Sequence, residues 1–374
     1  MAKDSTALPK ADPADITPED EDILEEPQKP KSSSKLAKRI GVTLFVVLNA
    51  VVIYFIAKDA LSKDAPPMEP FSFANILFLL GGILCLFAVL GCETLKYILM
   101  MRHLGEKVSV RHAFSTAALG KYYDCITPSG AGGQPFQIWY LHSQGYSVGA
   151  ASAMPLSGFF TMQFGFSGLC LIMFTFFNGA MKDPALKITA YIGAVAYLVV
   201  PVMIIISGFA PKISMRIVAF FVRIGAFLHL VKNPNQVIMK SVRSLNSYSK
   251  NIKRITSNRK LLVKLLLLSL IFQTAMCSMP YFAIHTFGGK IPYFEALALC
   301  TFIQAAISLI PTPGNSGAAE GAFYIIFSTF WPTLIWRLLC YYSFIIIGVL
   351  IYGYNALLKL LERKKETTSD DQSG

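Results

Sequence analysis

Thr127-Pro-Ser-Gly-Ala-Gly-Gly-Gln134 and Thr312-Pro-Gly-Asn-Ser-Gly-Ala-Ala-Glu320 place proline and glycine inside long apolar stretches of this chain. Proline removes a helical hydrogen bond and clashes with the preceding turn, so each stretch predicts a break in a hydrophobic helix. Irregular backbone is tolerated at membrane depth only where protein or a water-filled cavity covers its polar groups. A pair of such breaks in the two halves of a chain therefore points to a transporter's binding site.

The composition predicts an all-α, polytopic membrane protein. Of the 374 residues, 54% are hydrophobic and only 15% are charged, against roughly 25% charged in an average soluble domain. A helix needs about 20 mainly apolar residues to span the hydrocarbon core. Six stretches meet this requirement: 40–57, 74–101, 147–178, 187–209, 261–287 and 334–360.

The polar segments divide the chain into a membrane domain with two tails. Residues 1–38 combine acidic and basic side chains with proline and serine, which predicts a disordered cytoplasmic tail. Residues 39–361 are expected to form the transmembrane domain, and within it residues 211–260 read as cytoplasmic interfacial and connecting helices. Residues 362–374 are expected to form a short cytoplasmic tail.

The positions of Lys and Arg predict the orientation. They gather before the first span, after the second, between 212 and 260, and after the last span. With six spans all these segments lie on one side, so we expect a multi-pass protein of the plasma membrane with both termini in the cytoplasm. Topology and anionic headgroups also account for the net charge of +12, so no nucleic-acid partner is expected.

Two segments that contain the breaks remain outside the six spans. With this topology, residues 110–145 begin and end on the cytoplasmic side, whereas residues 292–332 begin and end on the outer side. We therefore expect two re-entrant hairpins that enter from opposite faces and break near the midplane. Opposed hairpins of this kind are compatible with an inverted repeat.

A helix that starts inside the membrane directs free N–H groups and the positive end of its dipole at its surroundings, which favours an anion such as phosphate. Glycines at the breaks would let a ligand approach the backbone, and nearby polar side chains would add hydrogen-bond donors. The alternative is that the glycines only let helices cross closely. The glycines are Gly130, Gly132, Gly133, Gly314 and Gly317, and the polar residues are Thr127, Ser129, Gln134, Thr312, Asn315 and Ser316.

Four ionisable residues lie beside the breaks. A charge at the centre of a membrane helix costs about 2.5 to 3.5 kcal/mol on insertion scales, so each calls for a partner or a function. Lys121 and Arg337 are candidates for binding phosphate, and Asp124 and Glu320 for binding an amine. The alternatives are that Glu320 caps a helix and that Arg337 reaches the interface.

Another charged pair lies in the second predicted span. Glu93 and Lys96 are three residues apart, a spacing that places two side chains next to each other on a helix. We expect them to neutralise each other.

The sequence contains no recognisable catalytic motif. It lacks the HExxH, GxSxG and Walker patterns and has no Cys/His cluster. No catalytic residue, metal site or cofactor is therefore expected.

Two longer stretches, Gly120-Lys-Tyr-Tyr-Asp-Cys-Ile-Thr-Pro-Ser-Gly-Ala-Gly-Gly-Gln-Pro-Phe-Gln137 and Pro311-Thr-Pro-Gly-Asn-Ser-Gly-Ala-Ala-Glu-Gly321, resemble the flippase-like membrane domain of lysylphosphatidylglycerol synthases. This family includes the multiple peptide resistance factor and stand-alone relatives. The resemblance covers residues 40 to 360. It implies translocation of phospholipid, including aminoacylated phosphatidylglycerol, between leaflets, and a link to resistance against cationic antimicrobial peptides.

The resemblance also implies alternatives. In bifunctional members an aminoacyl-transferase domain follows the membrane region, whereas few residues follow the last span here, so lysyl transfer is not expected of this chain. A membrane-lipid transferase carrying the phosphatidylglycerol lysyltransferase name, and a non-transporting scaffold for a separate synthase, remain alternative functions. The expected partners are membrane phospholipids. A separate lipid-modifying enzyme and an oligomer are both compatible with the sequence.

Overall fold

The computed structural model describes Tyr54 and residues 73–127, 130, 132–209, 249–308, 310, 312, 314–327 and 330–354. All of them belong to one compact unit, Phe45–Gly374. This part of the chain contains helices and no strand, which confirms the all-α prediction. The predicted tails, most of the first span at 40–57 and most of the connector at 211–260 lie outside the described residues.

Four helices in the described part are long and apolar enough to cross a membrane, and they correspond to four of the predicted spans. They are Asn75–Leu104 within α2 (Phe73–Leu104), α5 (Val148–Phe176), α9 (Arg259–His285) and Trp331–Tyr354. The predicted span at 187–209 lies in α6 (Pro184–Phe209), whose residues Pro184–Val199 form a shorter apolar stretch.

The two motif regions form pairs of short helices. The first pair is α3 (Val110–Ile126) and α4 (Gly133–Ser143), and the second is α10 (Tyr293–Ile307) and α11 (Ala318–Phe327). At 1.5 Å per residue, a helix of 17 residues is about 25 Å long, and the other three are shorter. None matches the hydrocarbon core of about 30 Å by itself.

The final membrane helix is not a regular α-helix throughout. It begins as α12 (Phe330–Arg337), continues as the π-helix η2 (Leu338–Tyr342) and returns to α-helix up to Tyr354. Single turns of π-helix occur frequently at functional sites. The irregular turn follows directly after Arg337, one of the predicted site residues.

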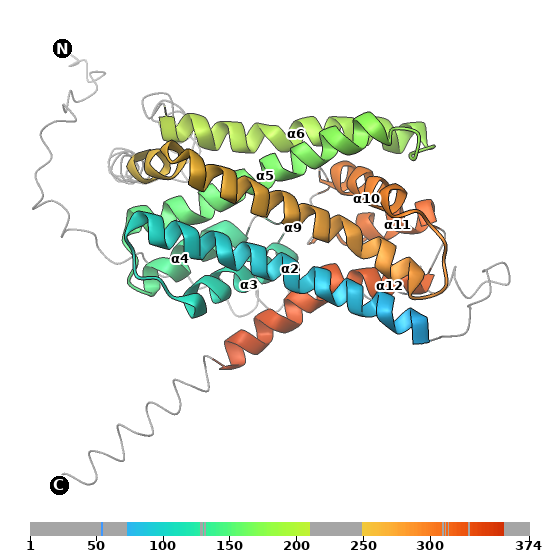
Figure 1. Cartoon of the computed structure of the whole chain (residues 1–374), viewed down its shortest axis with the longest axis horizontal. Helices are drawn as coiled ribbons and strands as arrows, with labels where there is room; N and C mark the ends of the chain where they lie inside the picture. The colour runs from blue at the N-terminus through green and yellow to red at the C-terminus, as the bar shows by residue number, and fades with distance from the viewer. Residues whose placement is uncertain are drawn as a thin grey trace, which may run out of the picture. The chain divides into compact units, whose positions relative to one another are not determined.

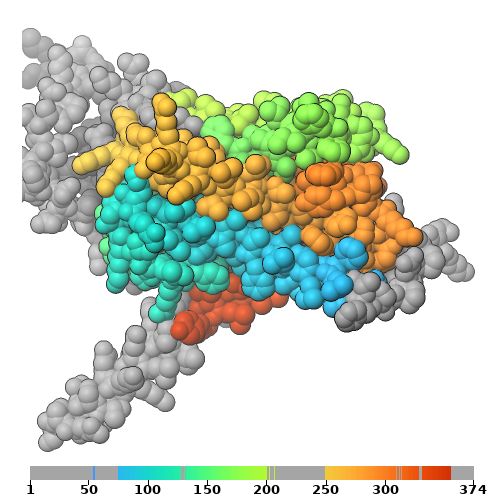
Figure 2. Space-filling model, viewed as in Figure 1, coloured from blue at the N-terminus to red at the C-terminus, as the bar shows by residue number. Residues whose placement is uncertain are grey.

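The long helices pack along one another, and the short pairs lie at different ends of the bundle. In Figure 1, α2, α5, α6 and α9 run in similar directions, with α3 and α4 toward one end and α10, α11 and α12 toward the other. α9 contacts both α2 and α5, and α10 packs against α6 and α9. Figure 2 shows α10 (orange) lying between α6 (green) and α2 (blue) on this face.

The outer face of α2 is apolar. Leu77, Leu80, Leu84 and Phe87 recur at three- or four-residue spacing, and between 53% and 69% of each is exposed. In water this stripe would be a costly surface, whereas against lipid tails it is favourable. The stripe fits a helix that faces the hydrocarbon of a bilayer.

In each pair of short helices, residues just before the pair contact residues just after it. For the first pair, Tyr146 Oη donates to the Lys107 carbonyl at 2.9 Å, and Ser147 Oγ donates to Glu106 Oε1 at 2.5 Å. For the second pair, the rings of Phe287 and Trp331 stack with their centroids 6.4 Å apart. The chain therefore enters and leaves each pair at nearly the same point.

The end of the predicted connector is helical and packs on α2. Residues 249–257 form a helix in which Ile252 and Ile255 are fully buried. Arg254 Nη1 donates to the Leu104 carbonyl at 3.0 Å, and the Arg254 carbonyl lies 2.9 Å from His103 Nε2. This helix directly precedes α9 in the sequence and packs against the C-terminal end of α2.

Candidate functional site

The first break separates α3 from α4, and side chains from α3 satisfy the backbone of α4. Thr127 Oγ1 accepts from the Gly132 N–H at 2.8 Å, and Asp124 Oδ1 accepts from the Gly133 N–H at 3.1 Å. The first N–H groups of a helix have no partner within it, so these two bonds cap α4. A Cβ atom at Gly132 would lie 2.5 Å from the Thr127 methyl group, and one at Gly133 would overlap Asp124. The cap therefore requires glycine at both positions.

The second break has its own carboxylate cap. Glu320 Oε2 accepts from the Gly317 N–H at 2.7 Å, which confirms the capping alternative for this residue. Gly314, Asn315 and Gly317 have φ angles of 54°, 55° and 87°. These left-handed conformations suit glycine, and asparagine more than other residues with a side chain.

Arg337 belongs to this second break. Its Nε donates to Glu320 Oε1 at 2.6 Å, and its Nη2 donates to Ser316 Oγ at 3.0 Å. Only 4% of Arg337 is exposed. The alternative that it snorkels to the interface is therefore wrong, because its guanidinium is held in the protein interior by its carboxylate partner.

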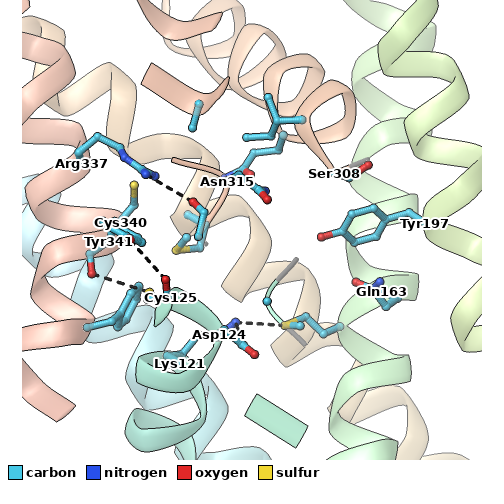
Figure 3. Close-up of a pocket in the computed structure, with 18 of the residues that line it drawn as sticks. Lys121, Asp124, Cys125, Gln163, Tyr197, Ser308, Asn315, Arg337, Cys340 and Tyr341 are labelled. Carbon is cyan, nitrogen blue, oxygen red and sulfur yellow. Dashed lines mark hydrogen bonds and ion pairs between the residues drawn. The ribbon is translucent and has the colours of Figure 1, made fainter. Parts of the chain in front are cut away.

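The two breaks share a cavity of about 450 Å³. Figure 3 shows side chains converging on it from α3, from the loop that carries Asn315, from the last membrane helix, and from α5 and α6. Seven of the predicted site residues line it: Lys121, Asp124, Gly130, Gln134, Gly314, Asn315 and Arg337.

The other predicted site residues do not line this cavity. Several of them shape the breaks or pair with residues that do line it, as the caps by Thr127 and Glu320 illustrate. This group consists of Thr127, Gly132, Gly133, Thr312, Ser316, Gly317 and Glu320, and Ser129 lies outside the described residues.

The polar lining residues that were not predicted from the sequence include four that belong to α5, α6 and α10 or follow α10. Gln163 comes from α5, Tyr197 from α6, Gln304 from α10 and Ser308 from the turn that ends α10. Figure 3 shows Gln163, Tyr197 and Ser308 on the side of the cavity opposite Arg337. For Gln163 and Gln304, the sequence did contain a signal of a site residue, because each is an amide side chain inside an otherwise apolar segment.

Lys121 is the cation that lies open to the cavity. Its Nζ is 3.5 Å from Asp124 Oδ2, and 18% and 21% of the two side chains are exposed. The ammonium also lies 4.9 Å from the centroid of the Phe272 ring and 3.8 Å from Met162 Sδ. An ammonium has three donors, so this long ion pair leaves Lys121 able to bind a further anion.

The two breaks follow the same chemical plan. At each, a carboxylate accepts a backbone N–H of the break and pairs with a cation: Asp124 with Lys121, and Glu320 with Arg337. Together with the amide and hydroxyl groups, they give the cavity both signs of charge and many donors. Among the described residues, no group of three or more His, Cys, Asp or Glu side chains is arranged to hold a metal ion.

Tyr341 of η2 connects the two breaks. Its hydroxyl donates to the Cys125 carbonyl at 3.3 Å, just before the first break. Its ring lies 4.2 Å from the Arg337 guanidinium and fills the space into which a Cβ of Gly314 would point. A displacement of either break must therefore move or release this ring.

Residues 36–348 match the family described as lysylphosphatidylglycerol synthase TM region. The chain belongs to this family. All cavity-lining residues lie inside the range matched to the lysylphosphatidylglycerol synthase TM region. The resemblance expected from the two motifs is thus confirmed.

A UPF0104 membrane protein of Archaeoglobus fulgidus is similar to this member of the family. The two are 22% identical over 354 residues, and the match covers 85% of this chain and 97% of the archaeal protein. No solved structure matches the chain.

Proposed function

We propose that this protein moves phospholipid between the two leaflets by passing the headgroup through the cavity between the breaks. The observation that supports the proposal is that segments almost 200 residues apart in sequence contribute backbone and charged groups to one cavity of about 450 Å³. This volume lies within the range of about 300 to 1,000 Å³ typical of small-molecule sites. Membership of a family named for a lipid synthase favours a lipid as the ligand.

The lining suits the headgroup of a phospholipid. Lys121 offers an ammonium to the phosphate, while Asp124 offers a carboxylate to an amine. Gln163 and Gln304 can bind hydroxyl or ester groups through their amides. Acyl chains would stay in the bilayer, beside outer helix faces such as that of α2. The α3–α4 and α10–α11 pairs would act as re-entrant gates that open the cavity to one leaflet at a time.

The test is leaflet exchange in proteoliposomes. Headgroup-labelled phosphatidylglycerol and lysylphosphatidylglycerol are placed in one leaflet, and their redistribution is followed for the wild type and for Lys121→Met. We expect protein-dependent movement, with at least a tenfold loss in Lys121→Met because the phosphate loses its exposed cation. The matched control is Lys264→Met, an exposed lysine on α9 outside the cavity lining, which should move lipid at the wild-type rate.

Two outcomes of this assay would contradict the proposal. If the wild type leaves both lipids in their original leaflet, the flippase proposal is wrong, and the transferase and scaffold alternatives are then tested by product analysis and by co-purification. If Lys121→Met and Lys264→Met behave alike, lipid moves by a route other than this cavity.

A further inference from the structure

Four amide side chains line the cavity, and none of them makes a hydrogen bond to another described residue. They are Gln134, Gln163, Gln304 and Asn315, which come from α4, α5, α10 and the second break. An amide side chain carries two donors and an acceptor. The cavity is therefore surrounded by unused hydrogen-bonding groups that carry no charge.

Gln163 is the most informative of these amides. It lies between Met162 and Phe164 in the apolar helix α5, and only 6% of it is exposed. Figure 3 shows it on the side of the cavity opposite Arg337. A buried amide without a partner is unfavourable, so its presence calls for a function.

Amides outside the cavity lining do have partners. Gln137 donates to the Thr116 carbonyl at 3.2 Å, and Gln273 donates to the Met162 carbonyl at 3.4 Å. Unpaired amides thus distinguish the cavity lining from these two neighbouring sites.

The charges are confined to one part of the cavity lining. The described lining residues of α5, α6 and α10 include no Asp, Glu, Lys or Arg. Among the described lining residues, Asp124 is the single carboxylate, and it already accepts from the Gly133 N–H and pairs with Lys121. The predicted pairing of Glu93 with Lys96 is confirmed at 2.8 Å, but neither residue lines the cavity.

This distribution of charge suits one class of headgroup. Lys121 Nζ lies 3.8 Å from Met162 Sδ, so a phosphate bound at Lys121 is close to the turn of α5 that carries Gln163. The rest of the headgroup then meets amides instead of carboxylates. A hydroxyl group both donates and accepts, as an amide side chain does. An ammonium on this side would find no carboxylate, and it could reach Asp124 only in exchange for Lys121.

We propose that the cavity selects an anionic phosphodiester whose headgroup is an uncharged polyol, such as glycerol, inositol or a sugar. Gln163 and Gln304 are the specificity-determining residues, and their amides bind the hydroxyl groups. The inference rests on the proposed function and names the class of headgroup that is moved. An aminoacylated headgroup, which adds positive charge, is a poorer ligand.

The first experiment measures binding, without transport, to the purified full-length protein in detergent. The matched ligands are phosphatidylglycerol and phosphatidylpropanol, which have the same charge and differ by two hydroxyl groups. We expect phosphatidylglycerol to bind about tenfold more tightly, because each hydroxyl forms hydrogen bonds that the propyl group cannot form. Equal affinity for the two lipids, or tighter binding of lysylphosphatidylglycerol than of phosphatidylglycerol, would overturn the inference.

A soluble ligand tests whether the polyol belongs to a lipid. Glycerophosphoglycerol carries the same phosphodiester and hydroxyl groups without acyl chains. We expect it to bind more weakly than phosphatidylglycerol. Equally tight binding would support the polyol site but would identify a soluble phosphodiester as its ligand, which would contradict the lipid in the proposed function.

Gln163→Met and Gln304→Met test the assigned residues, with Gln144→Met as the matched control. Gln144 is an exposed amide beyond the end of α4 and outside the cavity lining. We expect both cavity variants to reduce the preference for phosphatidylglycerol over phosphatidylpropanol several-fold, while the control keeps it. Loss of an unpaired buried amide should leave the melting temperature of Gln163→Met unchanged or higher. An unchanged preference in both cavity variants, or equal weakening of both lipids with a lower melting temperature, would exclude a role in specificity.

Transport in proteoliposomes separates this inference from the proposed function. We expect phosphatidylglycerol to exchange between leaflets faster than phosphatidylpropanol. Exchange of both lipids at one rate, together with equal binding, would overturn the polyol selection and leave the flippase standing. Selective binding of phosphatidylglycerol without exchange of either lipid would do the reverse.

Discussion

Gly314 lies where a glycine is required for two independent reasons. Its φ angle of 54° is left-handed, and a Cβ atom would overlap the Tyr341 ring. Gly321, seven residues later in α11, is helical, and a Cβ there would meet no atom within 4 Å. Glycine is therefore required at position 314 and is not required at position 321.

We expect Gly314→Ala to destabilise the protein and Gly321→Ala to leave it unchanged or slightly more stable. Left-handed backbone at a residue with a side chain costs about 1 to 3 kcal/mol, and the overlap with Tyr341 adds to it. Alanine in a helix is favoured over glycine by about 0.5 to 1 kcal/mol. Thermal unfolding of the two variants in detergent checks this, and equal melting temperatures would contradict the described backbone.

Glu320 and Arg337 form a buried pair whose members depend on each other. We expect Glu320→Gln or Arg337→Met alone to destabilise the fold by about 3 to 5 kcal/mol, because each leaves an unpaired buried charge. The double variant should be more stable than either single variant. A double-mutant cycle of unfolding measures this, and additive losses would mean that the two side chains do not interact.

At the scale of elements, the two breaks could be located from the sequence, but the side of the cavity that α6 and the end of α10 form could not. Pro128 and the neighbouring glycines cannot continue a helix, so the interruption after α3 follows from local chemistry. Tyr197 and Ser308 become site residues only because α6 and α10 pack together. Such long-range packing leaves no local pattern.

The same limit applies to the role of Arg337. Its position at the start of an apolar helix fits both an interfacial and a buried residue. The choice depends on Glu320, which is 17 residues away on another helix. The predicted cap by Glu320 needed only its own first turn, and it was therefore accessible from the sequence.

The α3–α4 pair yields a prediction about its two ends. If the pair is a re-entrant hairpin, Lys107→Cys and Gln144→Cys should both react with a membrane-impermeant maleimide from the cytoplasmic side. Asn178→Cys and Lys290→Cys, at the other ends of α5 and α9, should react from outside. All four positions are exposed, and six of the seven native cysteines are buried. Reaction of positions 107 and 144 from opposite sides would show that this segment crosses the membrane.

At the scale of the molecule, the composition was enough to predict a helical membrane protein, and four of the six predicted spans have matching helices that could cross a membrane. Hydropathy succeeds here because apolar length is a property of each segment alone. A shared site for the two break regions was expected from their predicted entry from opposite faces, and Figure 3 shows residues of both regions at one cavity. The bridge made by Tyr341 was not expected, because it needs the relative depth of two distant helices.

The two ion pairs at the breaks bear on how the membrane voltage would act on the proposed transport. An elementary charge that crosses the full potential gains or loses about 2.3 kcal/mol per 100 mV. If the two breaks act as the proposed gates, Lys121 and Arg337 each move beside a carboxylate partner, so a change of gate without a headgroup should carry little net charge across the membrane. A singly anionic headgroup would then be the main charge that moves, so the membrane potential should act on the loaded step of the proposed transport and hardly at all on the return of the empty gates.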